Sequence, residues 1–231
     1  MRRTNSVAVL VAAALASLSF PCGAQSDTTA RTSTDLPAPQ SLDARPPSLS
    51  VWVQSGPASF HTVRLGGFAG ARLRALGLRW HHTLHRSDRF VLASIPDLVV
   101  VSSLDRINDR RIVGEGIRRA LVLTKDGHTH GVGTLPLGIR AALDDRKPLG
   151  AFVDVSAGLQ YFFRAVPDYR ATRLNAQLMA AAGLRSTIGK RVEAELAYRL
   201  LHISNGGTAK ANPGLNFHQI AVGVGFRPHK R

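Results

Sequence analysis

The chain has 231 residues, with 30 Lys and Arg against 15 Asp and Glu, and a formal net charge of +15 at pH 7. Its single cysteine, Cys22, lies near the N-terminus, so the rest of the chain must be stabilised by backbone pairing and burial, without disulfides. After residue 24 no apolar run approaches the ~20 residues of a membrane-spanning helix, so a helical membrane domain is not expected.

The N-terminus has the organisation of a secretory signal peptide. Arg2 and Arg3 precede an apolar run at residues 6–20, and small residues up to Ala24 predict cleavage after that residue. We therefore expect residues 1–24 to be removed. Two competing interpretations are an uncleaved anchor helix and a lipid-modified Cys22. The first is disfavoured by the short apolar run, and the second by the bulky residues before the cysteine.

Export changes the meaning of the basic charge. In the cytoplasm a strongly basic chain would suggest a nucleic-acid partner, whereas the abundant anions outside the inner membrane are lipid phosphates. We therefore expect membrane lipids as partners and no nucleic acid. The alternative is that the excess charge only aids solubility.

The body of the chain alternates with the two-residue period of β-strands. Residues 25–47 are rich in Ser, Thr, Asp and Pro and predict a flexible lead-in. In 192–204 and 216–226 the even positions are mostly apolar, and the odd positions of 192–204 include Glu193, Glu195 and Arg199. Such segments predict strands with one face in lipid and one in a polar lumen.

Eight segments of suitable length follow one another. They are 48–56, 62–82, 89–102, 131–142, 149–161, 174–184, 192–204 and 216–226. We therefore predict an all-β fold, an eight-stranded antiparallel transmembrane β-barrel over residues 48–226, followed by a short basic tail at 227–231.

The connections support this arrangement. Those at 83–88, 144–148 and 187–190 are short, and those at 103–130, 164–172 and 205–215 are longer. Outer-membrane barrels have short periplasmic turns and longer outer loops, so the pattern predicts the outer membrane of a Gram-negative cell. A soluble periplasmic barrel or sandwich would show the same alternation. The role of loop 103–130 stays open.

One stretch near the C-terminus carries chemistry. It reads YRLLHISNGG at 198–207, followed by NPGLNF at 212–217. His202 and Ser204 share the apolar face of their strand, and an antiparallel hairpin would bring Asn216 close to them. Ser becomes a nucleophile when a His removes its proton and a third group orients that His. The alternative is that these polar residues only mark the membrane interface.

This stretch resembles the C-terminal signature of the lipid A 3-O-deacylase family of outer-membrane acyl hydrolases, and PLGAFVDVSAGLQYFF at 148–163 resembles the family's earlier strand. The likeness covers roughly residues 148–226 well and the N-terminal half only in general pattern. It implies a carboxylic ester hydrolase that removes the 3-position acyl chain of lipid A, in lipopolysaccharide of the outer leaflet, without a cofactor.

By position, the resemblance makes Ser204 the nucleophile and His202 the general base. Asn205 and the backbone N–H of Gly207 would line the oxyanion hole. The sequence departs from the family at Asn216, where the family has a Glu that orients the His. An Asn can accept the His N–H but supplies no full negative charge, so weakened catalysis is expected. His218, on the same face, is an alternative contributor.

Other signals are weaker. His81, His82 and His85 lie near a short turn without a carboxylate pattern, so no metal site is expected there or at His128 and His130. Arginines in 103–130 could meet lipopolysaccharide phosphates or be merely solvated. A homodimer is an open option. The competing function is a non-enzymatic small outer-membrane barrel with a structural or interaction role, a degenerate relative of the family.

Overall fold

The computed structural model of the protein describes residues 48–58, 71–113, 120–143, 148–167, 169–189, 191–209 and 214–226, and for 108–113 and 120–125 the backbone alone. The expected signal peptide, lead-in and basic tail lie outside these residues. None of the described segments forms a helix long and apolar enough to cross a membrane.

Nine antiparallel strands make up the regular structure of the described residues. In chain order they are β1 (Ser48–Pro57), β2 (Arg72–Arg86), β3 (Phe90–Ser94), β4 (Asp97–Val113), β5 (Ala120–Leu143), β6 (Leu149–Val166), β7 (Thr172–Ile188), β8 (Val192–Ser204) and β9 (Leu215–Phe226).

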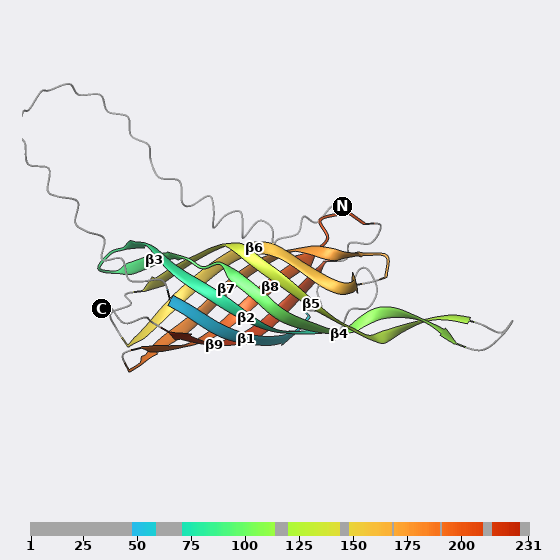
Figure 1. Cartoon of the computed structure of the whole chain (residues 1–231), viewed down its shortest axis with the longest axis horizontal. Helices are drawn as coiled ribbons and strands as arrows, with labels where there is room; N and C mark the ends of the chain where they lie inside the picture. Colours follow the sequence, from blue (N-terminus) through green and yellow to red (C-terminus); the bar gives the residue numbers. More distant parts are fainter. Residues whose placement is uncertain are drawn as a thin grey trace, which may run out of the picture. The chain divides into compact units, whose positions relative to one another are not determined.

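The strands close into a ring with eight positions (Figure 1), because β1 pairs with both β9 and β2. β3 and β4 share one position, since each pairs with β2 on one side and β5 on the other. The break between them falls at Ile95 and Pro96, and proline has no N–H for the ladder. The Trp80 N–H donates to the Pro96 carbonyl, and the Ile95 N–H donates to Gly138, so the position stays continuous. The predicted eight-stranded antiparallel barrel is confirmed.

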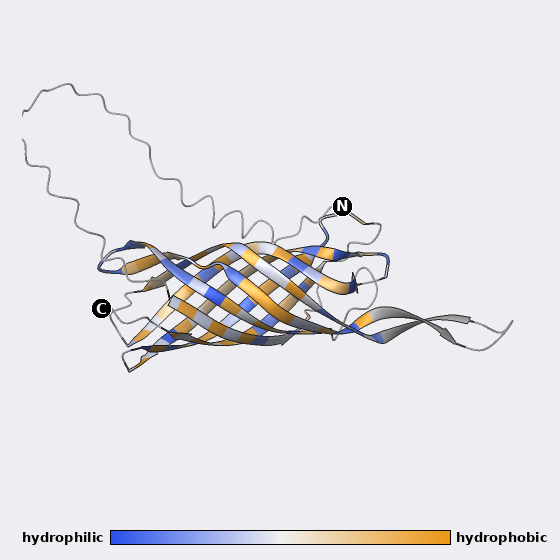
Figure 2. Cartoon of the chain, in the orientation of Figure 1, coloured by the Kyte–Doolittle hydropathy of each residue, from blue (hydrophilic) through white to orange (hydrophobic). Residues whose placement is uncertain are grey.

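Alternate side chains point out of and into this barrel, which Figure 2 shows as alternating hydropathy along the strands. In β8, Leu196 and Leu200 are 54% and 46% exposed, whereas Arg199 between them is 3% exposed. The same contrast holds in β9, where Val222 is exposed and Gln219 is buried. The expected outward and inward faces of these two strands are confirmed.

Inward-facing charges form a continuous ion-pair network. Arg79 makes two hydrogen bonds of 2.7 Å to Asp97 and one of 2.7 Å to Asp154. Arg140 contacts the other oxygen of Asp154 at 2.7 Å and also pairs with Glu195. The alternation predicted an inward place for Glu195, but its partner Arg140 lies on β5, far away in the sequence.

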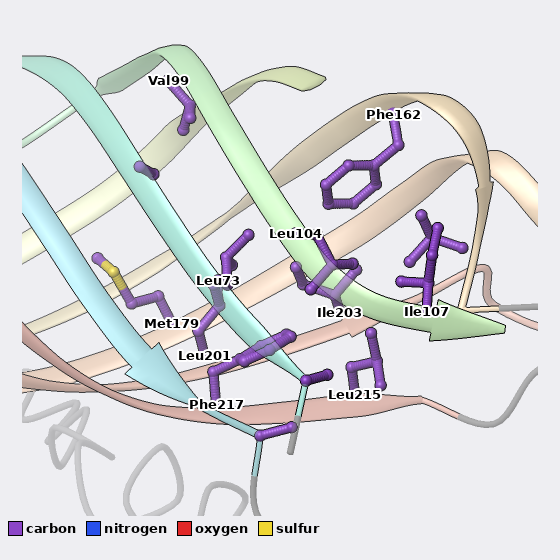
Figure 3. Packing of buried hydrophobic residues seen from close by; sticks show 14 of the residues in the cluster. Leu73, Val99, Leu104, Ile107, Phe162, Met179, Leu201, Ile203, Leu215 and Phe217 are labelled. Atoms are coloured by element: carbon purple, nitrogen blue, oxygen red, sulfur yellow. The ribbon is translucent and has the colours of Figure 1, made fainter. Parts of the chain in front are cut away.

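Apolar inward side chains pack toward the end of the barrel at which β8 ends and β9 begins, here called the β8–β9 end. Figure 3 shows Leu104, Ile203, Leu215 and Phe217 converging there. Leu104 and Phe217 have no exposed surface. Because these residues hold the inward faces of β8 and β9 in place, they fix the outward residues between them.

Several predicted boundaries were wrong, since β6 ends at Val166 and β7 at Ile188, beyond the predicted 161 and 184. Residues 103–130, expected to be a loop, instead continue β4 to Val113 and start β5 at Ala120. Beyond Ile107 these strands pair only with each other. A two-stranded ribbon need not bury one face, so its sequence shows no clear alternation. β2 likewise extends to Arg86 through part of the predicted turn at 83–88, and residues 62–70 of that predicted strand are outside the described part.

Candidate active site

Three of the predicted site residues lie together on the outer face at the β8–β9 end. His202 of β8 is directly opposite Asn216 of β9, and Ser204 follows His202 on the same face. All three are partly exposed. The pairing follows from the antiparallel register, in which the inward-facing pairs Leu201–Phe217 and Ile203–Leu215 lie on either side of this pair.

A hydrogen bond of 2.7 Å joins His202 Nδ1 to Asn216 Oδ1. The amide oxygen can only accept, so Nδ1 carries the hydrogen and Nε2 retains a lone pair. The tautomer of the imidazole is therefore the one in which Nε2 can act as a base. The contact expected from the hairpin is present, and Asn216 takes the orienting position.

Ser204 follows His202 by two residues in β8, so it is the next residue on the same face, and it is opposite Ala176 of β7. No hydrogen bond links Ser204 to His202 among the described side chains. Catalytic hydrogen bonds are often long without substrate and tighten when it binds. The arrangement thus supplies a hydroxyl, a base and an orienting group on one small surface.

Gly214 completes the surroundings of the imidazole and was missed as a site residue. A Cβ placed on it would lie 2.8 Å from His202 Cε1, closer than nonbonded carbons approach. Only glycine therefore lets the chain entering β9 pass this near the ring. The sequence motif at 212–217 includes this residue, but only the tertiary contact with His202 explains why a glycine is required there.

The two predicted oxyanion residues lie in the tight turn after β8. Asn205 is buried, and its Oδ1 accepts the Gly207 N–H at 3.0 Å. Gly206 and Gly207 have φ values of 63° and 81°, a region that favours glycine. In this structure the Gly207 N–H is thus directed at Asn205, and it would reach an oxyanion by sharing or releasing that bond.

A second polar pair lies further along the same face. Tyr198 of β8 hydrogen-bonds through its hydroxyl to His218 Nδ1, and the two rings are 6.0 Å apart between centroids. His218 was weighed as a contributor to the site. Its ring is engaged by Tyr198, a partner that the sequence did not suggest.

The site is set in an apolar surface. Leu178 of β7, opposite His202, is 55% exposed, and Leu200 and Leu174 are also exposed. The described residues contain no group of three side chains suited to a metal ion. His81, one of the discounted histidines, instead faces Ser50, with 3.3 Å between Oγ and Nε2.

Comparisons with known proteins bear on the family and on the fold. The family model for lipid A 3-O-deacylase (PagL) matches residues 109–225. Among solved structures, the crystal structure of the outer membrane enzyme PagL has a TM-score of 0.57 at 15% identity, covering 75% of this chain and 97% of that chain. Neisserial surface protein A has a TM-score of 0.50 at 11% identity, with 79% and 97% covered.

No curated protein sequence matches the chain significantly. The two structural likenesses bear on the fold alone, and they agree with the eight-position ring described above. The family match is broader evidence, because it spans about half of the chain and includes β6 to β9 with His202, Ser204 and Asn216. The chain belongs to the PagL family of lipid A 3-O-deacylases.

Proposed function

We propose that this protein is a carboxylic ester hydrolase that removes the 3-position acyl chain of lipid A. The observation that carries the proposal is the 2.7 Å hydrogen bond from His202 to Asn216 beside Ser204, on an apolar outer surface. Family membership supports lipid A as the substrate. No cofactor is required for this chemistry.

In the proposed reaction the Ser204 hydroxyl attacks the ester carbonyl while its proton passes to His202 Nε2. The tetrahedral intermediate collapses to an acyl-enzyme, and His202 returns the proton to the departing sugar oxygen. Water, deprotonated by the same nitrogen, then attacks the acyl-enzyme, releasing a fatty acid and restoring Ser204. Asn216 orients the imidazole throughout.

The carbonyl oxygen becomes negative during both steps and needs donors aimed at it. Asn205 and the Gly207 N–H are the proposed donors. Their mutual hydrogen bond of 3.0 Å supports a turn that holds them close to Ser204. Substrate would then compete with Asn205 Oδ1 for the Gly207 N–H.

The protein is proposed to act in the outer membrane of a Gram-negative cell, exported by the signal peptide at 1–24. Exposed apolar side chains around the barrel support insertion in lipid, because a water-soluble protein rarely exposes so much contiguous apolar surface. Lead-in 25–47 and tail 227–231 would flank the barrel at 48–226. Contacts with outer-membrane lipids and a homodimer are further proposals.

The test is mass spectrometry of lipid A from Gram-negative cells that express the parent chain or the Ser204→Ala variant. Loss of one ester-linked acyl chain with the parent only is the expected result. The folded barrel must be present in the outer membrane in both strains. Heat-modifiable migration of outer-membrane fractions on a gel checks this. Identical lipid A in the two strains would argue against Ser204 as nucleophile.

The second candidate is a non-enzymatic barrel with a structural or interaction role. Asn216 favours it, because the residue lacks the negative charge that stabilises an imidazolium. Unchanged lipid A in every strain, including one that expresses an Asn216→Glu variant, would support this function over hydrolysis.

A further inference from the structure

A group of arginines lies on the outer face of the barrel near the candidate active site but outside it. Arg72 and Arg74 are successive outward residues at the start of β2, and Arg106 is exposed on β4. Asp105 of β4 is opposite Arg72 and pairs with Arg74, with 3.1 Å between Nη1 and Oδ2. Of the three arginines, only Arg74 is paired with this carboxylate.

The single carboxylate leaves this group with surplus positive charge. The side chains of Arg72 and Arg106 make no hydrogen bond or ion pair with any described residue. The Arg74–Asp105 pair is itself half-exposed, with side-chain exposures of 55% and 33%, so its guanidinium keeps further donors available. Planar guanidinium groups bind phosphate oxygens through paired, charge-assisted hydrogen bonds.

The backbone at Arg106 is unusual in a way that adds to the group. Arg106 has a φ of 63°, and among the described residues it alone combines a positive φ with a side chain. It lies at a bulge in the pairing of β4 with β5, between Asp105 and Ile107. Bulges re-aim side chains, and here Arg106 is exposed next to Asp105 while Ile107 returns to the interior. The strained position presents a third cation beside the other two.

The register places the arginines at the same end of the barrel as the candidate active site. Arg72 is opposite Pro57 of β1, and the adjacent Ala58 bridges to Phe217, the neighbour of Asn216. β2 is two strands from β9, or about 10 Å across the surface at ordinary strand spacing. The described residues facing outward between them on β1, Ser55 and Pro57, are small. A large glycolipid head group could therefore meet both places.

We propose that Arg72, Arg74 and Arg106 form a binding site for a phosphate group on the head group of a membrane glycolipid. The inference rests on the proposed function in one respect, that this glycolipid is the substrate of the enzyme. The site binds the phosphate of the same molecule whose ester reaches Ser204, and so sets the position of the ester. A hydrocarbon-facing surface with fixed cations at its edge suits a lipid-borne phosphate better than a free one.

The test measures binding of diphosphoryl lipid A in mixed micelles to the full chain carrying Ser204→Ala, which keeps the ligand intact. The reference ligand is the same lipid A with both phosphates removed. Replacing Arg72 and Arg74 together by Gln is expected to weaken diphosphoryl lipid A binding about ten-fold or more. Binding of the dephosphorylated lipid is expected to stay the same. The matched control is Arg89→Gln, an exposed arginine between β2 and β3 at the opposite end of the barrel.

Equal affinity of the double variant and its parent for diphosphoryl lipid A would overturn the site, as would equal binding of the two lipids by the parent. Displacement of the lipid by an equal concentration of inorganic phosphate would assign the group to free phosphate instead. If the double variant does not fold, Arg106→Gln takes its place and should also weaken binding of diphosphoryl lipid A. The affinity of the parent for this lipid should in addition fall with rising salt, and the absence of both effects would overturn the site. Hydrolysis is assayed separately with Ser204 intact, so phosphate-dependent binding without hydrolysis would refute the proposed function and leave this site standing.

Discussion

The third member of a catalytic triad has two tasks, to orient the histidine and to stabilise its positive charge. Asn216 Oδ1 accepts from His202 Nδ1 at 2.7 Å, which meets the first task. A neutral amide cannot meet the second. The candidate site therefore has an oriented histidine without a negative charge beside it to stabilise an imidazolium.

Restoring the charge should raise activity. We expect Asn216→Glu to increase kcat for lipid A deacylation by roughly ten-fold to a thousand-fold, because a carboxylate stabilises the imidazolium that forms in the transition state. The assay is release of fatty acid by the detergent-solubilised protein. Asn216→Ala is the control and should be slower than the parent, since it removes the orienting bond. A rate unchanged by Asn216→Glu would contradict this account.

Gly214 contributes to the site because it has no Cβ and so leaves room for the imidazole of His202. We expect Gly214→Ala to reduce deacylation strongly while the barrel still folds, because a Cβ there would lie 2.8 Å from His202 Cε1 and displace the imidazole. Gly225→Ala is the matched control, since the nearest atom to its Cβ is 3.5 Å away. Circular dichroism and heat-modifiable migration check folding. Equal activity of the two variants would show that the ring tolerates the contact.

At the scale of elements, β4 and β5 differ from the other strands. Beyond Asp105 in β4 and before Gly131 in β5 they pair only with each other, whereas most of the rest of each strand is held on both sides. An isolated two-stranded ribbon is marginally stable and adds little to the fold it leaves. The barrel should therefore be independent of this extension.

Shortening the ribbon tests that independence. Replacing residues 108–126 by Asn-Gly joins the Ile107–Gly127 pair with a two-residue turn that suits a hairpin. We expect the same folded migration and unfolding midpoint as the parent within error. Deleting Ala141 alone is the contrast, because it lies where β5 pairs with β3 and β6, and a one-residue slip turns a whole face inside out. A short-ribbon variant that fails to fold would refute the prediction.

At the scale of the whole molecule, the barrel reverses the usual distribution of polarity. Leucines and valines cover the outside, and the network of Arg79, Asp97, Asp154, Arg140 and Glu195 fills part of the inside. Five strands contribute to this network, so it ties distant parts of the ring together. Removing one member leaves buried charge without its partner.

We expect Asp154→Asn to lower the free energy of unfolding by about 3–5 kcal/mol, because both Arg79 and Arg140 would lose a buried counter-charge. Asp105→Asn, in the half-exposed pair with Arg74, should cost about 0–1 kcal/mol. Urea unfolding in lipid vesicles, followed by tryptophan fluorescence, measures both. Similar losses in the two variants would mean that the buried network contributes no more than a surface pair.

The local pattern of the chain was enough to determine the eight-position barrel and its two faces. In β6 to β9 every second residue must suit lipid or the interior, so the alternation is strong and its direction can be read directly. The same period places His202 and Ser204 on one face, and the following hairpin brings Asn216 opposite. The ribbon of β4 and β5 was missed because two strands that pair only with each other need not bury one face, and so need not alternate.

Contacts between distant strands were decided only by the closed ring. Arg79, Arg140 and Asp154 meet because curvature brings the inward faces of separate strands together, and no local spacing records which charge will face which. Gly214 is needed only because the imidazole of His202 lies beside it, and the arginines of β2 and β4 gather only through their register. The alternation of apolar and polar residues depends on whether each residue faces lipid or the interior, so it is visible in the sequence. Which side chains contact one another depends on how the strands close into a ring, so only the tertiary structure determines it.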